Sequence, residues 1–168
     1  MEQNQKDTNI KDIKVVFVCT GNTCRSCMAE GIFRAVSSER KEGASFSTMS
    51  RGLQAFDNDP ASQHSVKALK TLWNIDISLH KAKMLDTNDV LQADLLLTMT
   101  RQHRDTLRGK YPDKCTNIFT LKEYAYPELG VDSNLLDISD PFGMPYQQYE
   151  SCAREIFGCV KSVINKLR

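Results

Sequence analysis

Residues 15–28 read VVFVCTGNTCRSCM, and this stretch decides the fold. Its first four residues are a continuous apolar run, which is typical of a strand buried on both faces of a parallel sheet. After Ser26 the apolar residues take the spacing of a helix, with Met28, Ile32 and Phe33 recurring on one face. A buried strand, a short polar turn and a helix in immediate succession predict an α/β domain.

The turn between this strand and this helix is equipped to hold an anion and to attack it. A helix N-terminus presents unpaired N–H groups and positive dipole charge. Gly21 and Asn22 are residue types that tolerate the left-handed backbone angles that such a loop needs. Arg25 can grip two phosphate oxygens with its planar guanidinium. We expect these positive surroundings to keep Cys19 ionised, because the thiolate is the nucleophile, and we expect Ser26 to donate a hydrogen bond to it.

The rest of the chain alternates strands with helices. Strands are predicted over residues 13–19, 44–49, 94–98 and 118–121, and helices over residues 26–38, 60–73, 87–92, 100–108 and 146–167. This alternation predicts one domain with a parallel sheet covered by helices on both faces, and a ligand site at the carboxyl ends of the strands. The stretch 126–146 contains three prolines and is predicted to be a surface loop that carries function.

Composition limits the classes of protein that fit. The 168 residues suit a single domain, and 40% hydrophobic and 26% charged residues are ordinary for a globular protein. A net charge of +1 predicts no strong attraction to nucleic acid or membranes, and no apolar run is long enough for a transmembrane helix. Residues 1–12 are polar and are expected to be a disordered leader before a domain over residues 13–168. Six cysteines without a secretory signal favour free thiols and a cytoplasmic location. We expect a monomer.

On these residues the chain resembles the low-molecular-weight protein tyrosine phosphatase family, and within it the bacterial protein arginine phosphatases. The resemblance runs from about Ile13 to the C-terminus, through the matching segments VFVCTGNTCRS with MAE after it, Ser50-Arg51-Gly52, NIDISLH ending at His80, ADLLLTMTRQH, IFTLKEY and Asp140-Pro141-Phe142-Gly143. It implies a flavodoxin-like fold with four parallel strands and a phosphate-binding loop after the first of them. It also implies hydrolysis of phosphorylated protein substrates through a phosphocysteine intermediate, without a metal or other cofactor.

The resemblance carries catalytic roles onto three residues of this chain. Cys19 is the expected nucleophile, Arg25 the phosphate clamp, and Asp140 the general acid that then activates water. An Asp-Pro pair also occurs at Asp59, and such a pair often only starts a turn. The family's acid lies in an Asp-Pro-aromatic motif late in the chain, and this selects Asp140.

The remaining expected site residues surround these three. The phosphate loop also contains Thr20, Gly21, Asn22, Thr23, Cys24 and Ser26. Two residues outside it match family residues that support the loop: His80, and Ser50 acting through Asn22.

Thr23 and Phe142 are the expected specificity residues. Tyrosine-specific relatives typically carry a bulky aliphatic residue at the position of Thr23, whereas arginine phosphatases carry Thr, which leaves room for a flat guanidinium and offers it a hydroxyl. Phe142-Gly143 indicates the same substrate, because tyrosine-specific relatives often place an aromatic pair after Asp-Pro. Thr23 can also simply hydrogen-bond the loop. The prediction is therefore a protein arginine phosphatase, with a protein tyrosine phosphatase as the alternative.

The cysteines leave other classes open. Cys24 and Cys27 have the spacing of a thiol oxidoreductase motif, and with Cys19 they have the spacing of plant-type iron–sulfur ligands, for which Cys115 is the candidate fourth ligand. Cys27 departs from the family, which nearly always has Pro there, and predicts a slightly looser helix start. We also hypothesise a reversible Cys19–Cys24 disulfide that protects the nucleophile from over-oxidation.

Two further classes are disfavoured by what the sequence lacks. Thioredoxin-coupled arsenate reductases share the loop but need two more redox cysteines in a region where this chain has Met99, Thr100 and Leu107. The three histidines show no paired metal-ligand spacing, so no metal site is expected. A module that binds phosphate without turnover remains an alternative to an enzyme.

Overall fold

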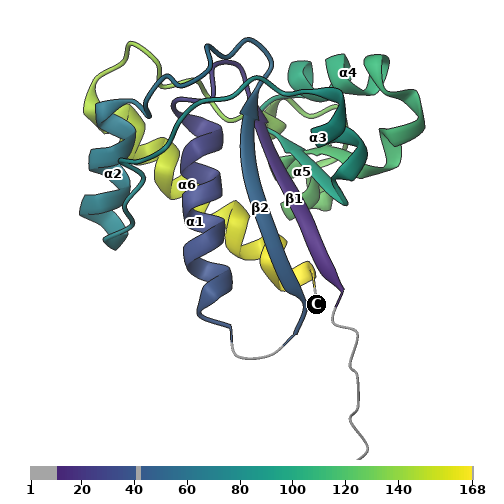
Figure 1. The fold of residues 1–168 in the computed structure, drawn as a ribbon, viewed down its shortest axis with the longest axis horizontal. Helices are drawn as coiled ribbons and strands as arrows, with labels where there is room; N and C mark the ends of the chain where they lie inside the picture. Colours follow the sequence, from purple (N-terminus) through teal and green to yellow (C-terminus); the bar gives the residue numbers. More distant parts are fainter. Residues whose placement is uncertain (1–10, 41–42, 168) are drawn as a thin grey trace, which may run out of the picture.

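Four parallel strands form the centre of the computed structural model, which describes residues 11–40 and 43–167 (Figure 1). They are β1 (Asp12–Cys19), β2 (Ser45–Gly52), β3 (Leu95–Thr98) and β4 (Ile118–Thr120). Their spatial order is β2-β1-β3-β4, so the chain changes direction across the sheet at β1. The carboxyl end of β1 is therefore the topological switch point, where α/β sheets bind ligands. The predicted flavodoxin-like fold class is confirmed.

Helices cover both faces of this sheet. They are α1 (Arg25–Ser38), α2 (Gln63–Trp73), α3 (Thr87–Gln92), α4 (Arg101–Lys110), α5 (Leu121–Ala125) and α6 (Tyr146–Lys166). One apolar cluster joins α1, α2, α5 and α6 to the sheet, and a second, smaller cluster joins α3 and α4 to the opposite face. In the described part of the chain, no helix has the length and apolarity to cross a bilayer. The cytoplasmic location stays a prediction.

The continuous apolar run of β1 is explained by these two clusters. Successive side chains of a strand point to opposite faces. Val15 and Phe17 accordingly enter the cluster under α1, while Val16 and Val18 enter the cluster under α3 and α4, and all four are fully buried. Phe17 meets Phe33 of α1 edge to face, with ring centroids 5.6 Å apart. The helix that follows β1 is thus held directly over its own strand.

Several element boundaries differ from the prediction for local reasons. The helix predicted from residue 60 begins at Gln63, because the Ser62 side chain caps it by accepting from the Ser65 amide at 3.1 Å. Residue 121, the predicted end of a strand, instead starts α5. There Thr120 and Glu123 form a capping box, in which each side chain accepts a hydrogen bond from the other residue's backbone N–H.

Three other expectations concern the ends of elements. The helix predicted to end at residue 108 continues through Gly109 to Lys110 as α4. Residues 126–146 are expected to be loop, and they contain two short 3-10 turns, Pro127–Leu129 and Asn134–Leu136. Most of the expected leader, residues 1–10, lies outside the described residues, and Asp12 already belongs to β1.

Candidate active site

The sulfur of Cys19 lies at the carboxyl end of β1, where the strand runs into the loop. The residue is only 3% exposed. Its Sγ lies 2.9 Å from the Ser26 hydroxyl oxygen and accepts a hydrogen bond from the Asn22 amide at 3.3 Å. The sulfur thus faces one backbone N–H donor and one hydroxyl at the carboxyl end of the strand. The sequence predicts Ser26 at this sulfur, and the structure also brings the Asn22 amide to it.

Asn22 makes most of the hydrogen bonds that hold the loop in place. It is fully buried, and its φ of 58° is the left-handed conformation that asparagine tolerates. Its side-chain nitrogen donates to the hydroxyls of Ser26 and Ser50 at 2.8 and 2.9 Å, and its side-chain oxygen accepts from the Lys83 amide at 3.0 Å. Its carbonyl oxygen lies 2.7 Å from His80 Nε2. Both supporting residues named from the family resemblance, Ser50 and His80, thus contact the loop through this asparagine.

A glycine on the neighbouring strand lets β2 approach the loop closely. A Cβ on Gly52 would lie 2.5 Å from the Thr20 carbonyl oxygen and 3.0 Å from the Asn22 amide nitrogen. Two residues after Gly52, the Gln54 backbone amide donates to the same Thr20 carbonyl at 2.9 Å. The sequence predicts left-handed backbone angles at Gly21 as well as at Asn22, but in this loop only Asn22 has a positive φ. The glycine that the geometry requires is therefore Gly52.

Arg25 connects the loop to Asp140. It is the first residue of α1, whose N-terminus has no side-chain cap, so its first-turn N–H groups remain available to an anion. The buried guanidinium donates to the Ile138 carbonyl at 2.9 Å, and its other nitrogen lies 3.2 Å from Asp140 Oδ2. The Asp140 side chain is half exposed, and its Oδ1 accepts from the Phe142 amide at 3.1 Å. Asp140 therefore lies beside Arg25 and remains open to the cavity and to solvent.

A cavity of about 360 Å³ opens over these groups. The loop residues from Cys19 to Arg25, except Asn22, line its floor, and its walls come from Gln54, Phe56, Asp59, Asp140 and Phe142. Two exposed aromatic rings, Phe56 and Phe142, flank it. In the sequence, Asp59-Pro60 is only a second Asp-Pro pair that competes with Asp140-Pro141 for the role of the acid motif. The fold brings the aspartates of both pairs to the same cavity.

The other cysteines are placed for packing. The buried Cys27 thiol donates to the Cys24 carbonyl at 3.1 Å, and burial raises its pKa well above the usual value. Burial likewise raises the pKa of Cys152 to about 12 and that of Cys159 to about 11. These thiols stay protonated at neutral pH and do not serve as nucleophiles. Cys24 Sγ lies 3.7 Å from the Tyr149 hydroxyl.

The structure offers no ligand set for the iron–sulfur alternative. Within residues 11–40 and 43–167, no group of three His, Cys, Asp or Glu side chains is arranged to hold a metal ion. The Cys115 thiol lies near the Arg108 carbonyl at 3.6 Å. Cys19 and Cys24 are both free thiols, and their pairing on oxidation stays a prediction.

His103 is a neighbour of the site that the sequence does not reveal. Its Nε2 lies 2.9 Å from the Thr20 hydroxyl in the loop. Burial, reinforced by the nearby Arg25 charge, lowers the pKa of His103 to about 4, so the ring is neutral at neutral pH. A lone histidine in a sequence carries no signal of this contact, which joins residues 83 positions apart.

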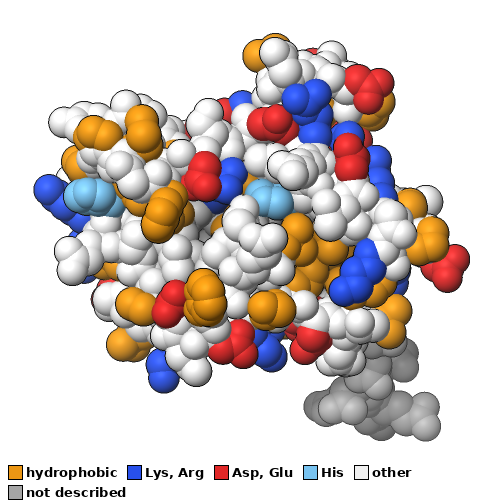
Figure 2. Space-filling view, turned by 90° about the horizontal axis from the view of Figure 1, so that it is seen from above, with side chains coloured by type: hydrophobic (Ala, Val, Ile, Leu, Met, Phe, Trp, Pro, Cys, Tyr) orange, Lys and Arg blue, Asp and Glu red, His pale blue; other side chains and the backbone are white. Residues whose placement is uncertain are grey.

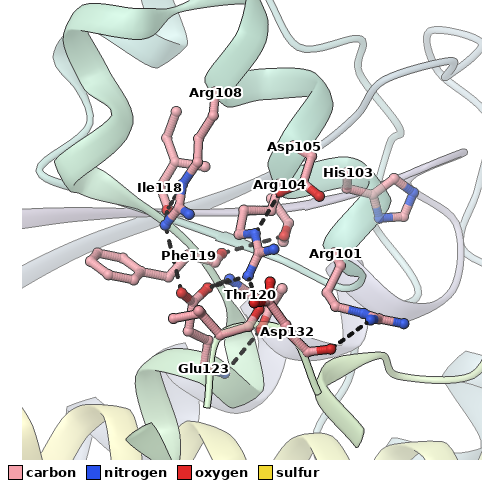
Figure 3. Close-up of polar contacts among 12 residues, drawn as sticks. Arg101, His103, Arg104, Asp105, Arg108, Ile118, Phe119, Thr120, Glu123 and Asp132 are labelled. Carbon is pink, nitrogen blue, oxygen red and sulfur yellow. Dashed lines mark hydrogen bonds and ion pairs between the residues drawn. The ribbon is translucent and has the colours of Figure 1, made fainter. Parts of the chain in front are cut away.

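The helix that carries His103 is anchored by buried charges (Figure 3). Arg104 lies 3.1 Å from Glu123 of α5 and donates to the Val131 carbonyl at 2.9 Å. The His103 ring points away from this ion pair, toward the loop side of α4. Replacing one partner of such a pair leaves an uncompensated buried charge. Loss of either partner should therefore destabilise the contact between α5 and the end of α4 on which His103 lies.

A second ion pair joins α4 to the segment that leads to Asp140. The Asp137 carboxylate accepts from the Arg101 backbone amide at 2.7 Å and pairs with the Arg101 guanidinium at 3.2 Å. Burial alone would raise the pKa of Asp137, but these hydrogen bonds hold it below its usual range. The Ile138 amide donates to the Met99 carbonyl at 2.9 Å. The backbone just before Asp140 is therefore tied to the end of β3.

A family model described as low molecular weight phosphotyrosine protein phosphatase matches residues 14–168. The chain belongs to this family. As a low molecular weight phosphatase it is a hydrolase, and the loop from Cys19 to Ser26 occupies the expected position after the first strand.

Individual relatives span nearly the whole chain. A protein-arginine-phosphatase of Bacillus subtilis (strain 168) is 35% identical over 92% of this chain and 96% of its own length. The low molecular weight protein-tyrosine-phosphatase PtpB of Staphylococcus epidermidis is 32% identical over 90% of this chain and 96% of its own length. The crystal structure of a low molecular weight protein tyrosine phosphatase from T. tengcongensis has a TM-score of 0.81 and 42% identity, over 92% of this chain and 99% of that one. A B. subtilis YwlE mutant has a TM-score of 0.82 and 32% identity, over 92% and 98%.

Proposed function

We propose that this chain is a cysteine-dependent protein phosphatase that removes phosphate from arginine side chains. The reaction class rests on one observation: Cys19 Sγ, the Arg25 guanidinium and the Asp140 carboxylate line one cavity at the N-terminus of α1. These are the three groups that transfer of phosphate to sulfur requires. A similar structure is that of a YwlE arginine phosphatase in which Cys is replaced by Ser, and it carries a phosphorylated active site serine.

The proposed mechanism has two displacements. In the first, the Cys19 sulfur attacks phosphorus, the phosphorus–nitrogen bond breaks, and Asp140 gives its proton to the leaving nitrogen. In the second, water attacks the phosphocysteine, Asp140 takes a proton from that water, and the sulfur–phosphorus bond breaks to release inorganic phosphate. Arg25 and the first-turn amides of α1 stabilise the equatorial oxygens in both steps.

The substrate class is supported by the charges around the cavity. Thr23 lines it with a short polar side chain, and the exposed carboxylate of Asp59 lines its wall. Within the described residues, no Lys or Arg forms an ion pair with Asp59, whereas Asp140 pairs with Arg25. A carboxylate beside a phosphate site opposes a purely anionic substrate and favours one that also carries a cation. Phosphoarginine is such a substrate.

Tyrosine phosphatase activity is the second candidate. The exposed rings of Phe56 and Phe142 flank the cavity, and aromatic side chains can stack on a phenyl ring. The relatives at 32% identity include the PtpB tyrosine phosphatase. A monomeric enzyme acting on phosphorylated proteins, with no nucleic acid, membrane or cofactor requirement, completes the proposal in either case.

Thr23→Ile separates the two candidates. We expect the wild type to release phosphate faster from phosphoarginine proteins than from phosphotyrosine proteins, and Thr23→Ile to shift this ratio toward phosphotyrosine by about tenfold, because a branched aliphatic side chain fills the space for the guanidinium and removes the hydroxyl. The measurement is kcat/KM on both substrate series, with Cys19→Ser as the inactive control. An unchanged ratio would refute the role of Thr23, and an active Cys19→Ser enzyme would refute the mechanism.

A further inference from the structure

A second cavity of about 500 Å³ lies beside the catalytic one and is larger than it. The two cavities share Thr20 and Gln54 in their walls, so they are joined across the first residue of the loop after the nucleophile. Figure 2 looks down on this end of the molecule and shows hydrophobic side chains recessed among polar ones. The proposed reaction does not use this second cavity.

Apolar side chains provide the larger part of the second cavity's lining, and polar residues, among them Gln102 and Thr106, provide the rest. Its walls include Leu53, Met84, Leu85, Leu107 and Tyr111. Met84 is 48% exposed, whereas Leu107 is almost fully buried and belongs to the core under α4. The cavity therefore has a buried apolar side chain, Leu107, at its base and the exposed side chain of Met84 at its edge.

One cation marks the rim of this hollow. Lys110, the last residue of α4, lines the cavity, and its ammonium lies 5.4 Å from the centre of the Tyr111 ring. The catalytic cavity, by contrast, carries the carboxylate of Asp59 in its wall. The two neighbouring cavities thus differ in charge: the first favours a cation beside the phosphate, and the second favours a neutral or acidic group.

We propose that the second cavity binds the substrate polypeptide next to its phosphorylated residue and receives an apolar side chain of that polypeptide. The inference rests on the proposed protein phosphatase function. A phosphorylated side chain that reaches Cys19 brings its own backbone to the rim of the catalytic cavity, and the shared wall of Thr20 and Gln54 leads from there into the apolar hollow. An extended chain advances about 3.3 Å per residue, so neighbouring residues reach an adjoining cavity. Lys110 adds a preference for an acidic residue beside the apolar one.

The Thr20–His103 contact lies at the junction of the two cavities. His103 lines the second cavity, and its Nε2 lies 2.9 Å from the Thr20 hydroxyl. The ring is neutral at neutral pH, so this wall adds no positive charge to the hollow. The junction between the two cavities is therefore polar but uncharged.

The test compares substrates with and without a flanking polypeptide. Peptide pairs carry either Leu or Gly beside the phosphorylated residue, and each pair is made in a phosphoarginine and a phosphotyrosine series. p-Nitrophenyl phosphate, which has no flanking chain, reports the chemistry alone. We expect the wild type to favour the Leu peptide by about fivefold to tenfold in kcat/KM, as for partial burial of one leucine side chain.

Met84→Glu should abolish this preference while changing kcat/KM for p-nitrophenyl phosphate by less than about twofold, because the exposed side chain touches only the second cavity. Lys110→Glu should reverse the preference for an acidic neighbour, which is measured on peptides that carry Glu or Lys next to the Leu. The matched controls are Leu91→Glu on α3 and Lys161→Glu on α6, which are exposed residues outside both cavities. Both controls should behave as the wild type.

Three outcomes would overturn the proposal. In the first, the wild type does not distinguish Leu from Gly peptides in the series that it hydrolyses. In the second, Met84→Glu loses as much activity on p-nitrophenyl phosphate as on the Leu peptide. In the third, the wild type is a dimer that Met84→Glu dissociates, which would assign the cavity to a second copy of the chain. Hydrolysis of the phosphotyrosine series alone would refute the arginine phosphatase function. The preference for Leu over Gly would still be measured in the phosphotyrosine series. A failure of the arginine phosphatase function is therefore distinguishable from a failure of the second-cavity proposal.

Discussion

At the scale of single residues, the site depends on a chain of short hydrogen bonds. Ser50 donates to Glu30 at 2.6 Å and accepts from Asn22, which in turn donates to Ser26, whose hydroxyl lies 2.9 Å from the Cys19 sulfur. Each hydroxyl is held from both sides, which fixes the direction in which Ser26 meets the sulfur. A fully satisfied buried network of this kind specifies one loop conformation.

Asp140→Asn should slow a phosphoarginine substrate far more than p-nitrophenyl phosphate. Nitrophenolate leaves without protonation, whereas the arginine nitrogen needs a proton, and general acid catalysis contributes about 10²-fold or more. The measurement is kcat for both substrates in the wild type and the variant. Equal losses on the two substrates would count against Asp140 as the acid. Asp59→Asn is the matched control, because it changes the other carboxylate of the cavity and should mainly raise KM for phosphoarginine.

His103 should make the protein less stable as the pH falls. Burial lowers the folded-state pKa from 6.5 to about 4, so between these values the unfolded chain binds the proton and the folded chain does not. Stability is therefore fully present above pH 6.5 and is lost as the pH falls toward 4, with a loss of about 2 kcal/mol by pH 4.5. Urea unfolding at pH 7 and pH 4.5 checks this.

The His103→Gln variant should lose about 2 kcal/mol less than the wild type over the same pH change, since its side chain does not titrate. His64→Gln, which replaces an exposed histidine, should keep the wild-type pH dependence. A His103→Gln variant with the same pH dependence as the wild type would show that His103 is not the group responsible.

At the scale of elements, the close approach of β2 to the loop decides the loop's shape. β1 and β2 pair in parallel over their full lengths, and Cys19 lies opposite Gly52 at the end of the ladder. Because the loop turns back over Gly52, any side chain there would meet the Thr20 carbonyl. The end of one strand thus shapes the catalytic loop that follows its neighbour.

Gly52→Ala should therefore reduce both stability and activity. We expect a loss of roughly 1–3 kcal/mol in the free energy of unfolding, as for overpacking, together with a fall in kcat because the loop must shift. Urea unfolding and steady-state kinetics measure the two effects. Gly109→Ala is the control: it lies in α4, where an added Cβ would have no atom within 4 Å, and should raise helix stability by about 0.5–1 kcal/mol without changing kcat. Normal kcat in Gly52→Ala would contradict the argument.

At the scale of the whole molecule, the site is assembled from distant segments around the switch point of the sheet. Cys19, the proposed nucleophile, ends β1, and Ser50 lies on β2. His80 comes from the segment after α2, and His103 lies on α4. Asp140, the proposed acid, lies on the long segment before α6, and Asp137 ties this segment to the start of α4. The sheet brings these groups together at one edge.

Asp137→Ala should weaken catalysis although the Asp137 side chain does not line the catalytic cavity. Losing the carboxylate frees the Arg101 amide and guanidinium, so the segment before Asp140 is held less firmly, and stability should fall by about 1 kcal/mol. We expect kcat to fall more for phosphoarginine than for p-nitrophenyl phosphate, which is the signature of a displaced acid. Asp137→Glu should restore part of the loss. An equal loss on both substrates would assign Asp137 a structural role only.

The sequence determined the fold class and the core of the site, because both depend on local patterns. The continuous apolar run before Cys19 indicates a buried strand, and the loop residues up to Ser26 are consecutive in the chain, so their roles can be assigned from spacing and family resemblance. The helices with strong apolar periodicity, such as α6, are also predictable to within a residue or two. Short elements set by side-chain caps, such as α5, are not, because a capping box overrides strand propensity over so few residues.

Only the tertiary structure decided which distant residues reach the site. Asp59, His103 and Gly52 carry no local signal of their roles: the first is one of two Asp-Pro pairs, the second a lone histidine, and the third a glycine whose neighbour is a carbonyl from another segment. Their positions follow from the strand order β2-β1-β3-β4, which is set by the packing of the whole chain. Contacts between residues far apart in sequence depend on that global arrangement, and local sequence patterns do not encode it.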